Sequence, residues 1–162
     1  MSEWRRWRNG LRRHLTLQAG WVAHYDYRRP SCGPSSFASV ELTLEPSDAF
    51  RFISQCEWPT YLTPSERRGL EDAIAAGVYD ALQPSGGVPY HAGGVVVTCT
   101  RIEWDDVGSS ANAFYAASWH ATRQARDQAQ WKLVDTPLSE AAEQSDAADE
   151  ARAGKSTRGL RS

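Results

Sequence analysis

The sequence predicts an α+β fold, a two-layer sandwich in which a small β-sheet carries two helices on one face. Runs in which apolar residues alternate with polar ones, or in which β-branched residues are frequent, occur in both halves of the sequence. Such runs are typical of β-strands. Two segments with helix-capping residues and apolar side chains at helical spacing follow strand-like runs. The 162 residues suffice for one domain with tails, and they are too few for a multi-domain motor or a classical GTPase.

The first predicted element is a basic amphipathic helix over Glu3–Leu15. Trp4, Trp7, Leu11 and Leu15 recur at helical spacing and form its apolar stripe. Five arginines lie largely off that stripe: Arg5, Arg6, Arg8, Arg12 and Arg13. Two interpretations stay open, an arm that binds RNA or an anionic surface and a terminal helix that packs its Trp face on the domain.

Extended segments are predicted next. Apolar residues alternate from Leu15 to Tyr27, which indicates a strand leading into the Gly/Pro/Ser-rich turn at residues 30–35. The alternation resumes from Phe37 to Leu44, and a short apolar run spans Phe50–Cys56. We expect these segments to form a β-hairpin or a meander.

The clearest helix start lies at Thr63. Thr63 is a candidate N-cap, Pro64 occupies the first helical position, and Glu66 completes a capping box. The Gly- and Pro-rich segment Gln83–Gly94 is predicted to be a loop that ends this helix.

The second half repeats the strand and helix pattern. Val95–Ile102 is β-branched and predicts a strand. Ser110 is expected to cap a second helix, and Gln130–Val134 to form a last strand. Residues from Ser139 onward carry too little apolar surface to offset chain entropy and are predicted to be disordered. The expected organisation is an arm over residues 1–15, a domain over 16–138 and a tail over 139–162.

Charge and cysteine content restrict the protein class. Residues 1–29 carry seven arginines against two acidic residues, whereas residues 30–138 carry seven basic against thirteen acidic residues. The net charge of −2 excludes a uniformly basic nucleic-acid coat. Cys32, Cys56 and Cys99 are an odd number without a close pair in the sequence, which argues against a disulfide framework or a zinc knuckle and favours a cytoplasmic location. No apolar run approaches the roughly 20 residues of a membrane span.

The sequence contains no recognisable catalytic constellation, so we expect no enzymatic activity, cofactor or metal. The histidines, His14, His24, His91 and His120, are scattered and lack metal-ligand spacing. Asp105 and Asp106 are the nearest approach to a metal site, but adjacent acids before a helix are usually favourable partners of its dipole. A phosphate-binding G-x-x-x-x-G-K-[ST] loop is absent.

From about Tyr27 to Asp135 the sequence resembles the fourth domain of translation elongation factor G and its ribosome-protection relatives. Four segments carry the resemblance in the family's order: residues 29–37 (RPSCGPSSF) with 40–46 (VELTLEP), residues 68–71 (RGLE) with Gly77, residues 107–110 (VGSS) with Ala113, Phe114, Ala117 and Ser118, and residues 133–135 (LVD).

The sequence also departs from the family pattern at both loops. Residues 32–35 read Cys-Gly-Pro-Ser where the family has a Gly-Gly-Arg-Gly core. Asp105 stands where the family's second loop carries a histidine, and Gly108 replaces its aspartate. An acidic residue that faces phosphates is repelled by them, so Asp105 departs from the family's tip chemistry.

The resemblance implies a fold like elongation factor G domain IV, that is, a ribosomal protein S5 domain 2-like fold. It also implies a stand-alone protein that binds the ribosome or structured RNA by mimicry of the tRNA arm, without GTPase activity. The implied RNA-binding residues are Arg28, Arg29, Ser31, Gly33, Asp105 and Ser109, and the arm adds Arg5, Arg6 and Arg8. The alternative is a protein-interaction or regulatory module that kept the fold and lost the ribosomal function. The oligomeric state stays open.

Overall fold

The structure, a computed structural model, describes residues 11–29, 36–85 and 88–137. The chain divides into two compact units, Arg13–Val134 and a second made of Met1–Arg12 with Asp135–Ser162. Nearly all described residues belong to the first unit. No helix among the described residues is long and apolar enough to cross a membrane.

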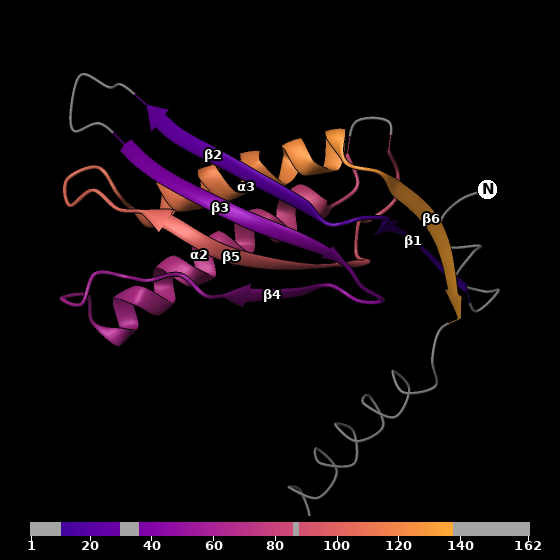
Figure 1. Cartoon of the computed structure of the whole chain (residues 1–162), viewed down its shortest axis with the longest axis horizontal. Coiled ribbons are helices and arrows are strands. Elements are labelled where there is room, and N and C mark those ends of the chain that lie inside the picture. The colour runs from indigo at the N-terminus through magenta and orange to yellow at the C-terminus, as the bar shows by residue number, and fades with distance from the viewer. Residues whose placement is uncertain (1–10, 30–35, 86–87, 138–162) are drawn as a thin grey trace, which may run out of the picture. The chain divides into compact units, whose positions relative to one another are not determined.

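Six strands and two helices make up the described chain (Figure 1). They are β1 (Leu11–Leu17), β2 (Trp21–Arg29), β3 (Ser36–Pro46), β4 (Arg51–Ser54), α2 (Pro64–Leu82), β5 (Val95–Glu103), α3 (Ala111–Gln128) and β6 (Trp131–Pro137). The larger sheet has the strand order β2-β3-β5-β4, and β1 pairs with β6 in a sheet of two strands.

The larger sheet is mixed. β2 and β3 form the predicted antiparallel hairpin, with Trp21 opposite Leu44 and Arg29 opposite Ser36. β5 pairs antiparallel with β3. The expectation that Phe50–Cys56 extends a hairpin or meander is wrong, because β4 pairs parallel with β5 and α2 makes the crossover between them. A parallel pair needs such a long connection.

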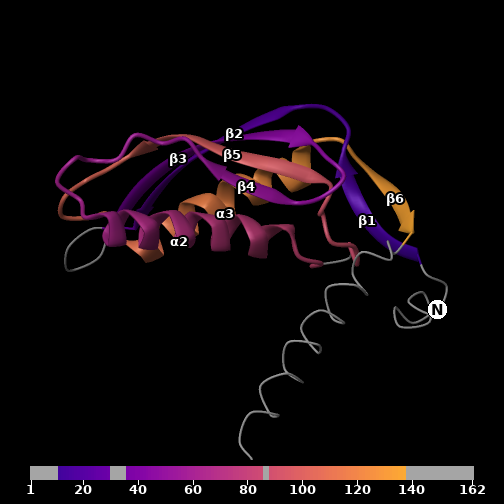
Figure 2. The same ribbon diagram turned by 90° about the horizontal axis from the view of Figure 1, so that it is seen from below.

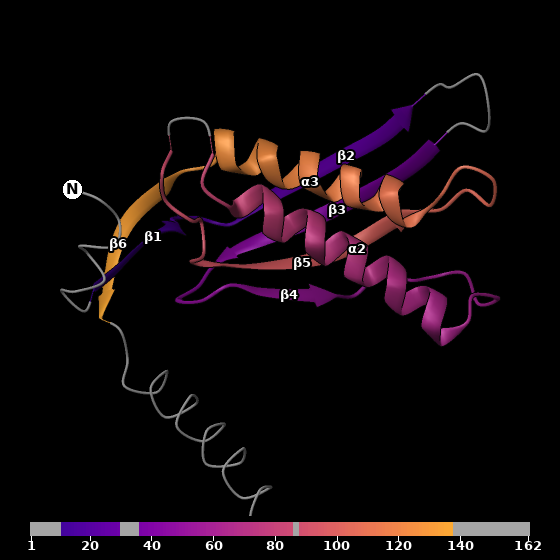
Figure 3. The same ribbon diagram turned by 180° about the vertical axis from the view of Figure 1, so that it is seen from behind.

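Both helices lie on the same face of the larger sheet, which confirms the predicted α+β sandwich (Figures 2 and 3). The helix-facing side chains of β3 are Ala38, Val40, Leu42 and Leu44, and each is fully buried. Val97 of β5 and Phe114 of α3 share that core. Burial of a side chain of this size stabilises the fold by about 1.5–3 kcal/mol.

Local sequence explains where the helices begin. The Thr63 side chain accepts a hydrogen bond from the Glu66 amide, and the Glu66 carboxylate accepts one from the Thr63 amide at 2.8 Å, so the predicted capping box is present. Ser110 caps α3 as predicted by accepting from the Ala113 amide at 3.2 Å. Gly77 lets the helices approach closely, because a Cβ there would collide with Ser118 and the Tyr115 carbonyl.

The N-terminal prediction needs correction. Leu11–Leu15 are not helical but lie in β1, and the strand expected from Leu15 to Tyr27 is broken at residues 18–20 between β1 and β2. Strand pairing with β6 overrides the helical spacing of Leu11 and Leu15. Residues 1–10 and 138–162 lie outside the described chain, so the arm, the tail and the boundaries proposed for them stay predictions.

Candidate nucleic-acid interface

Three segments meet at one end of the larger sheet, which we call the tip (Figure 1). The tip consists of Arg28 and Arg29 at the end of β2, Tyr61 in the β4–α2 connection, and the turn Trp104–Ser109 between β5 and α3. Of the implied RNA-binding residues, the structure brings together Arg28, Arg29, Asp105 and Ser109.

Asp105 and Ser109 build the β5–α3 turn by local hydrogen bonds. The Asp105 Oδ1 atom accepts from the amides of Val107 at 2.9 Å and Gly108 at 2.7 Å. The Ser109 Oγ atom accepts from the Asp105 amide at 2.9 Å. Asp105 therefore forms an Asx turn, in which a side-chain oxygen replaces a backbone acceptor. The carboxylate has a structural role at the position where the sequence suggested only repulsion of phosphates.

The same turn is tied to the β2–β3 hairpin. The Phe37 amide donates to the Gly108 carbonyl at 3.0 Å, and the Ser109 Oγ atom donates to the Phe37 carbonyl at 2.9 Å. These bonds hold two segments that are far apart in the sequence at a fixed separation.

Arg28 and Arg29 are both exposed at the end of β2. The Arg28 guanidinium lies 5.0 Å from the centroid of the Phe37 ring on the paired strand, a cation–π contact that leaves its N–H groups available to an anion. The Tyr25 and Tyr27 side chains of the same strand point toward α3. The Tyr25 ring stacks on His120 with a centroid distance of 4.7 Å.

Asp106 joins the β4–α2 connection to the turn. Its Oδ1 atom accepts from the Trp104 indole at 2.7 Å and from the Tyr61 hydroxyl. The hydrogen bond from Tyr61, followed by that from Trp104, lowers the pKa of the Asp106 carboxyl. The Tyr61 and Val107 side chains are 63% and 79% exposed, so the tip presents apolar surface beside its charges. The sequence analysis missed Tyr61, because its partner lies 45 residues away.

Aromatic contacts and side-chain hydrogen bonds hold the tip segments to the core. The Trp104 ring stacks on the buried Phe114 ring at 6.0 Å, and the Trp58 ring meets Phe114 edge-on at 5.4 Å. Glu71 on α2 accepts hydrogen bonds from Ser54 and Trp58, both at 3.0 Å, which fixes the β4–α2 connection. Glu71, part of the segment that resembles the family's helix, is thus a positioning residue.

The remaining implied residues are not described. Ser31 and Gly33 lie in residues 30–35, and Arg5, Arg6 and Arg8 in residues 1–10, all outside the described chain. Their part in RNA binding stays a prediction.

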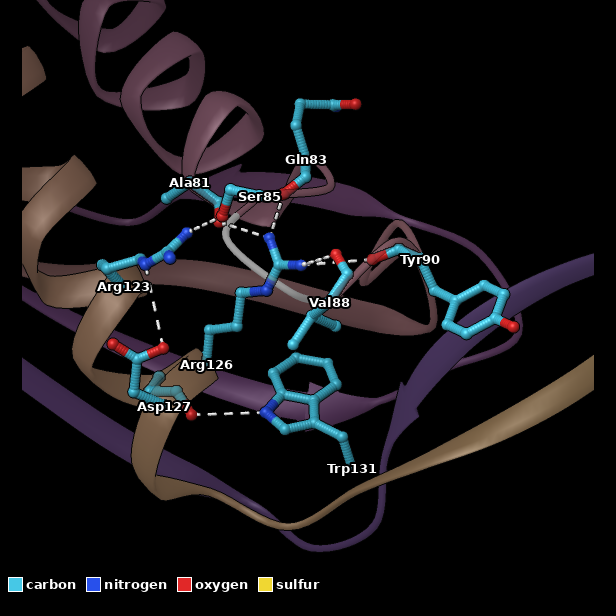
Figure 4. A network of polar contacts seen from close by, with 10 residues as sticks. Ala81, Gln83, Ser85, Val88, Tyr90, Arg123, Arg126, Asp127 and Trp131 are labelled. Atoms are coloured by element: carbon cyan, nitrogen blue, oxygen red, sulfur yellow. Dashed lines mark hydrogen bonds and ion pairs between the residues drawn. The ribbon is translucent and has the colours of Figure 1, made fainter. Parts of the chain in front are cut away.

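At the other end of the sheet Arg126 is buried, in contrast to the exposed arginine pair of the tip (Figure 4). Arg126 of α3 is 8% exposed and donates to the carbonyls of Ala81 at 3.1 Å, Tyr90 at 3.2 Å and Val88 at 3.5 Å, as well as to that of Gln83. Desolvation by burial lowers the pKa of this guanidinium. Arg126 holds the Gly- and Pro-rich loop to the end of α2.

One polar cluster has the composition of a catalytic triad without its geometry. The His24 Nε2 atom lies 3.1 Å from the Ser39 Oγ atom and 3.2 Å from the Asp26 Oδ1 atom. A triad needs the carboxylate on the other ring nitrogen, and Ser39 is only 2% exposed. Within the described residues no group of three or more His, Cys, Asp or Glu could hold a metal ion.

The chain is similar to parts of two known proteins. Elongation factor G 1 from Syntrophomonas wolfei subsp. wolfei is 30% identical over 112 residues, which cover 67% of this chain and 16% of that protein. The chain is distantly similar to part of elongation factor G. The crystal structure of ttk003000868 from Thermus thermophilus shares the fold, with a TM-score of 0.63 and 20% identity over 76% of this chain and 18% of that one. No family model matches the chain. The chain thus spans about a sixth of the length of its curated relative.

Proposed function

We propose that this protein is a relative of elongation factor G domain IV whose tip binds the ribosome or a structured RNA, and that this binding needs no GTPase activity of the domain. The observation that carries the proposal is the 30% identity to elongation factor G over 112 residues. The exposed arginine pair at the tip of the fold supports it.

Binding would act by occupancy. Arg28 and Arg29 would contact phosphates, because a guanidinium matches phosphate oxygens in a bidentate geometry. The hydrogen bonds that tie Ser109 to Phe37 would keep the two segments at a fixed separation, so that the tip enters an RNA groove as the anticodon arm of a tRNA does. Because the Asp105 carboxylate accepts two backbone amides, part of its charge is already compensated.

Co-sedimentation with ribosomes at increasing salt tests the proposal. Arg28→Glu with Arg29→Glu should weaken binding strongly and reduce the slope of log affinity against log salt by about 2. The matched control is Arg51→Glu with Lys132→Glu, which makes the same charge change at exposed positions away from the tip. Equal losses in both double variants, or no salt-sensitive sedimentation of the natural chain, would refute the proposal.

The predicted basic arm needs its own test. Removal of residues 1–14 would also remove half of β1, which begins at Leu11. Arg5→Glu, Arg6→Glu and Arg8→Glu in the full chain remove the positive charge and leave the strand intact. We expect weaker sedimentation at low salt and unchanged thermal unfolding.

The exposed apolar surface of the tip favours a second candidate function, a protein-interaction module. Val107 is 79% exposed and adjoins Asp106, so the turn would suit a partner with an apolar pocket rimmed by basic residues. Val107→Asp should abolish binding to such a partner, whereas the Arg28 and Arg29 reversals should leave that binding intact. The opposite pattern would support RNA binding.

A further inference from the structure

Two cysteine side chains, separated by 43 residues in the sequence, meet in the core. The Sγ atoms of Cys56 and Cys99 lie 2.7 Å apart. Both cysteines are free thiols, 5% and 0% exposed. No sequence pattern indicates this pair, which arises because β4 pairs with β5 and Ser54 lies opposite Cys99.

Neighbouring backbone contacts hold the two thiols together. The Gln55 amide donates to the Cys99 carbonyl at 2.9 Å, and the Cys56 Sγ atom lies 3.2 Å from the same oxygen. The sulfur separation exceeds the disulfide bond length of about 2.05 Å by well under 1 Å. A bond between them needs only a small side-chain movement.

We propose that Cys56 and Cys99 form a redox-active dithiol that hydrogen peroxide converts into a disulfide. Neither thiol belongs to the tip, so the oxidation can be tested without any assay of RNA binding.

The two thiols have different roles. The hydrogen bond with Cys99 lowers the pKa of the Cys56 thiol, whereas the hydrogen bond with Cys56 and burial both raise the pKa of the Cys99 thiol. Cys56 is also the more exposed of the two. Because the thiolate is the nucleophile, Cys56 attacks the oxidant and Cys99 resolves the product. Glu71 is the carboxylate that acts on both thiols, and it disfavours their ionised forms.

The reaction balances with one molecule of peroxide. The Cys56 sulfur attacks one peroxide oxygen, the O–O bond breaks, and the departing hydroxide takes the Cys56 proton and becomes water. The sulfur of Cys99 then attacks the Cys56 sulfenic acid, the S–O bond breaks, and the second hydroxide leaves as water with the Cys99 proton. The two thiols are oxidised, and the peroxide is reduced to two waters.

The product would join β5 to the start of the β4–α2 connection. Tyr61 and Trp58 lie in that connection, so oxidation would restrict the segment that supplies one side of the tip. It would also raise the melting temperature by about 10 °C, because the bond closes a long loop in the unfolded chain.

Peptide mapping of the natural full chain tests the proposal. The folded protein is treated with hydrogen peroxide, alkylated under denaturing conditions and digested with trypsin. We expect residues 52–67 and 69–101 to appear as one linked species, lighter by two hydrogen atoms than the sum of the two peptides. Cys32, carried by the peptide 29–51, should remain outside this link.

Two controls make the result decisive. The same treatment of the unfolded chain should distribute links among all three cysteine pairs. In Cys99→Ser, Cys56 should stop at the sulfenic acid, which dimedone captures. Alkylated Cys56 and Cys99 after peroxide treatment of the folded natural chain, or sulfinic acid without a link, would overturn the proposal. Neither outcome depends on RNA binding.

Discussion

Arg28 and Arg126 mark opposite ends of the same body and use the same guanidinium in opposite ways. At the tip, Arg28 is exposed and rests on the Phe37 ring. At the far end, Arg126 is 8% exposed and donates to backbone carbonyls of the loop that follows α2. Arg28 is available to an external anion, whereas Arg126 is used to hold the loop in place.

The difference shows that basic charge alone does not locate a binding surface. A loop without regular structure leaves carbonyl groups that need donors, and Arg126 supplies them at the far end. At the tip the carboxylate of Asp105 and the hydroxyl of Ser109 satisfy the turn, so Arg28 is not needed for that purpose. An arginine therefore remains available to a ligand where the nearby backbone groups already have hydrogen-bond partners.

The strongest test of this comparison exchanges each arginine for alanine. Arg126→Ala removes the donor from four backbone carbonyls, those of Ala81 in a buried contact and of three loop residues in part-buried contacts. It should lower the free energy of unfolding by about 3 kcal/mol. Arg28→Ala removes an exposed side chain and should change it by less than about 0.5 kcal/mol. Urea unfolding measures both, and similar losses in the two variants would remove the distinction between the ends.

The two glycines of α2 extend the comparison to the helix that runs between the ends. Gly77→Ala should lower the free energy of unfolding by about 2 kcal/mol, because its Cβ would collide with the backbone and Ser118 of α3. Gly69, nearer the tip, has nothing within 4 Å of its Cβ position, and Gly69→Ala should stabilise the protein by about 0.5–1 kcal/mol. Thermal unfolding would show shifts of opposite sign, and a destabilising Gly69→Ala would contradict the structure.

The smallest effect concerns the pH dependence of the tip. Hydrogen bonding to Asp106 raises the pKa of Tyr61. The contact therefore stabilises the fold fully at pH values below the ordinary tyrosine pKa of about 10. This stabilisation is lost as the pH rises through the raised pKa of Tyr61 in the folded protein. The lowered pKa of Asp106 adds stability above the ordinary aspartate pKa of about 3.9, which is lost as the pH falls through the lowered value.

Asp106→Ala should return the Tyr61 pKa to its ordinary value, as measured by ring carbon chemical shifts during a pH titration. The matched control is Asp80→Ala, since Asp80 accepts from Tyr115 at 2.8 Å and raises the pKa of that hydroxyl. Each variant should move only its own tyrosine. A Tyr61 pKa that stays raised in Asp106→Ala would exclude the hydrogen bond described here.

The elements that the sequence predicted correctly depend on neighbours in the chain. The Thr63 capping box, the Ser110 cap and the strand at Val95 each arise from residues within a few positions of one another. The loop residues Asp105 and Ser109 lie together because a short turn holds them, and their part in RNA binding stays a prediction.

The features that the sequence analysis missed depend on distant partners. Leu11 and Leu15 fit helical spacing, and only the pairing of β1 with β6 makes their segment a strand. The contact of Tyr61 with Asp106 spans 45 residues, and that of Cys56 with Cys99 spans 43. No local pattern encodes such contacts, since they follow from strand order.

The position of β5 has a consequence for how the chain folds. β3 and β4 precede β5 in the sequence, yet β5 lies between them in the sheet. The β2–β3 hairpin can therefore form early from local contacts, whereas β4 has no partner in this sheet until residues 95–103 arrive. During synthesis the growing chain presents an unpaired β3 edge until its central strand is made. Folding of the sheet ends with the insertion of an apolar strand, the stage at which association between chains competes most strongly.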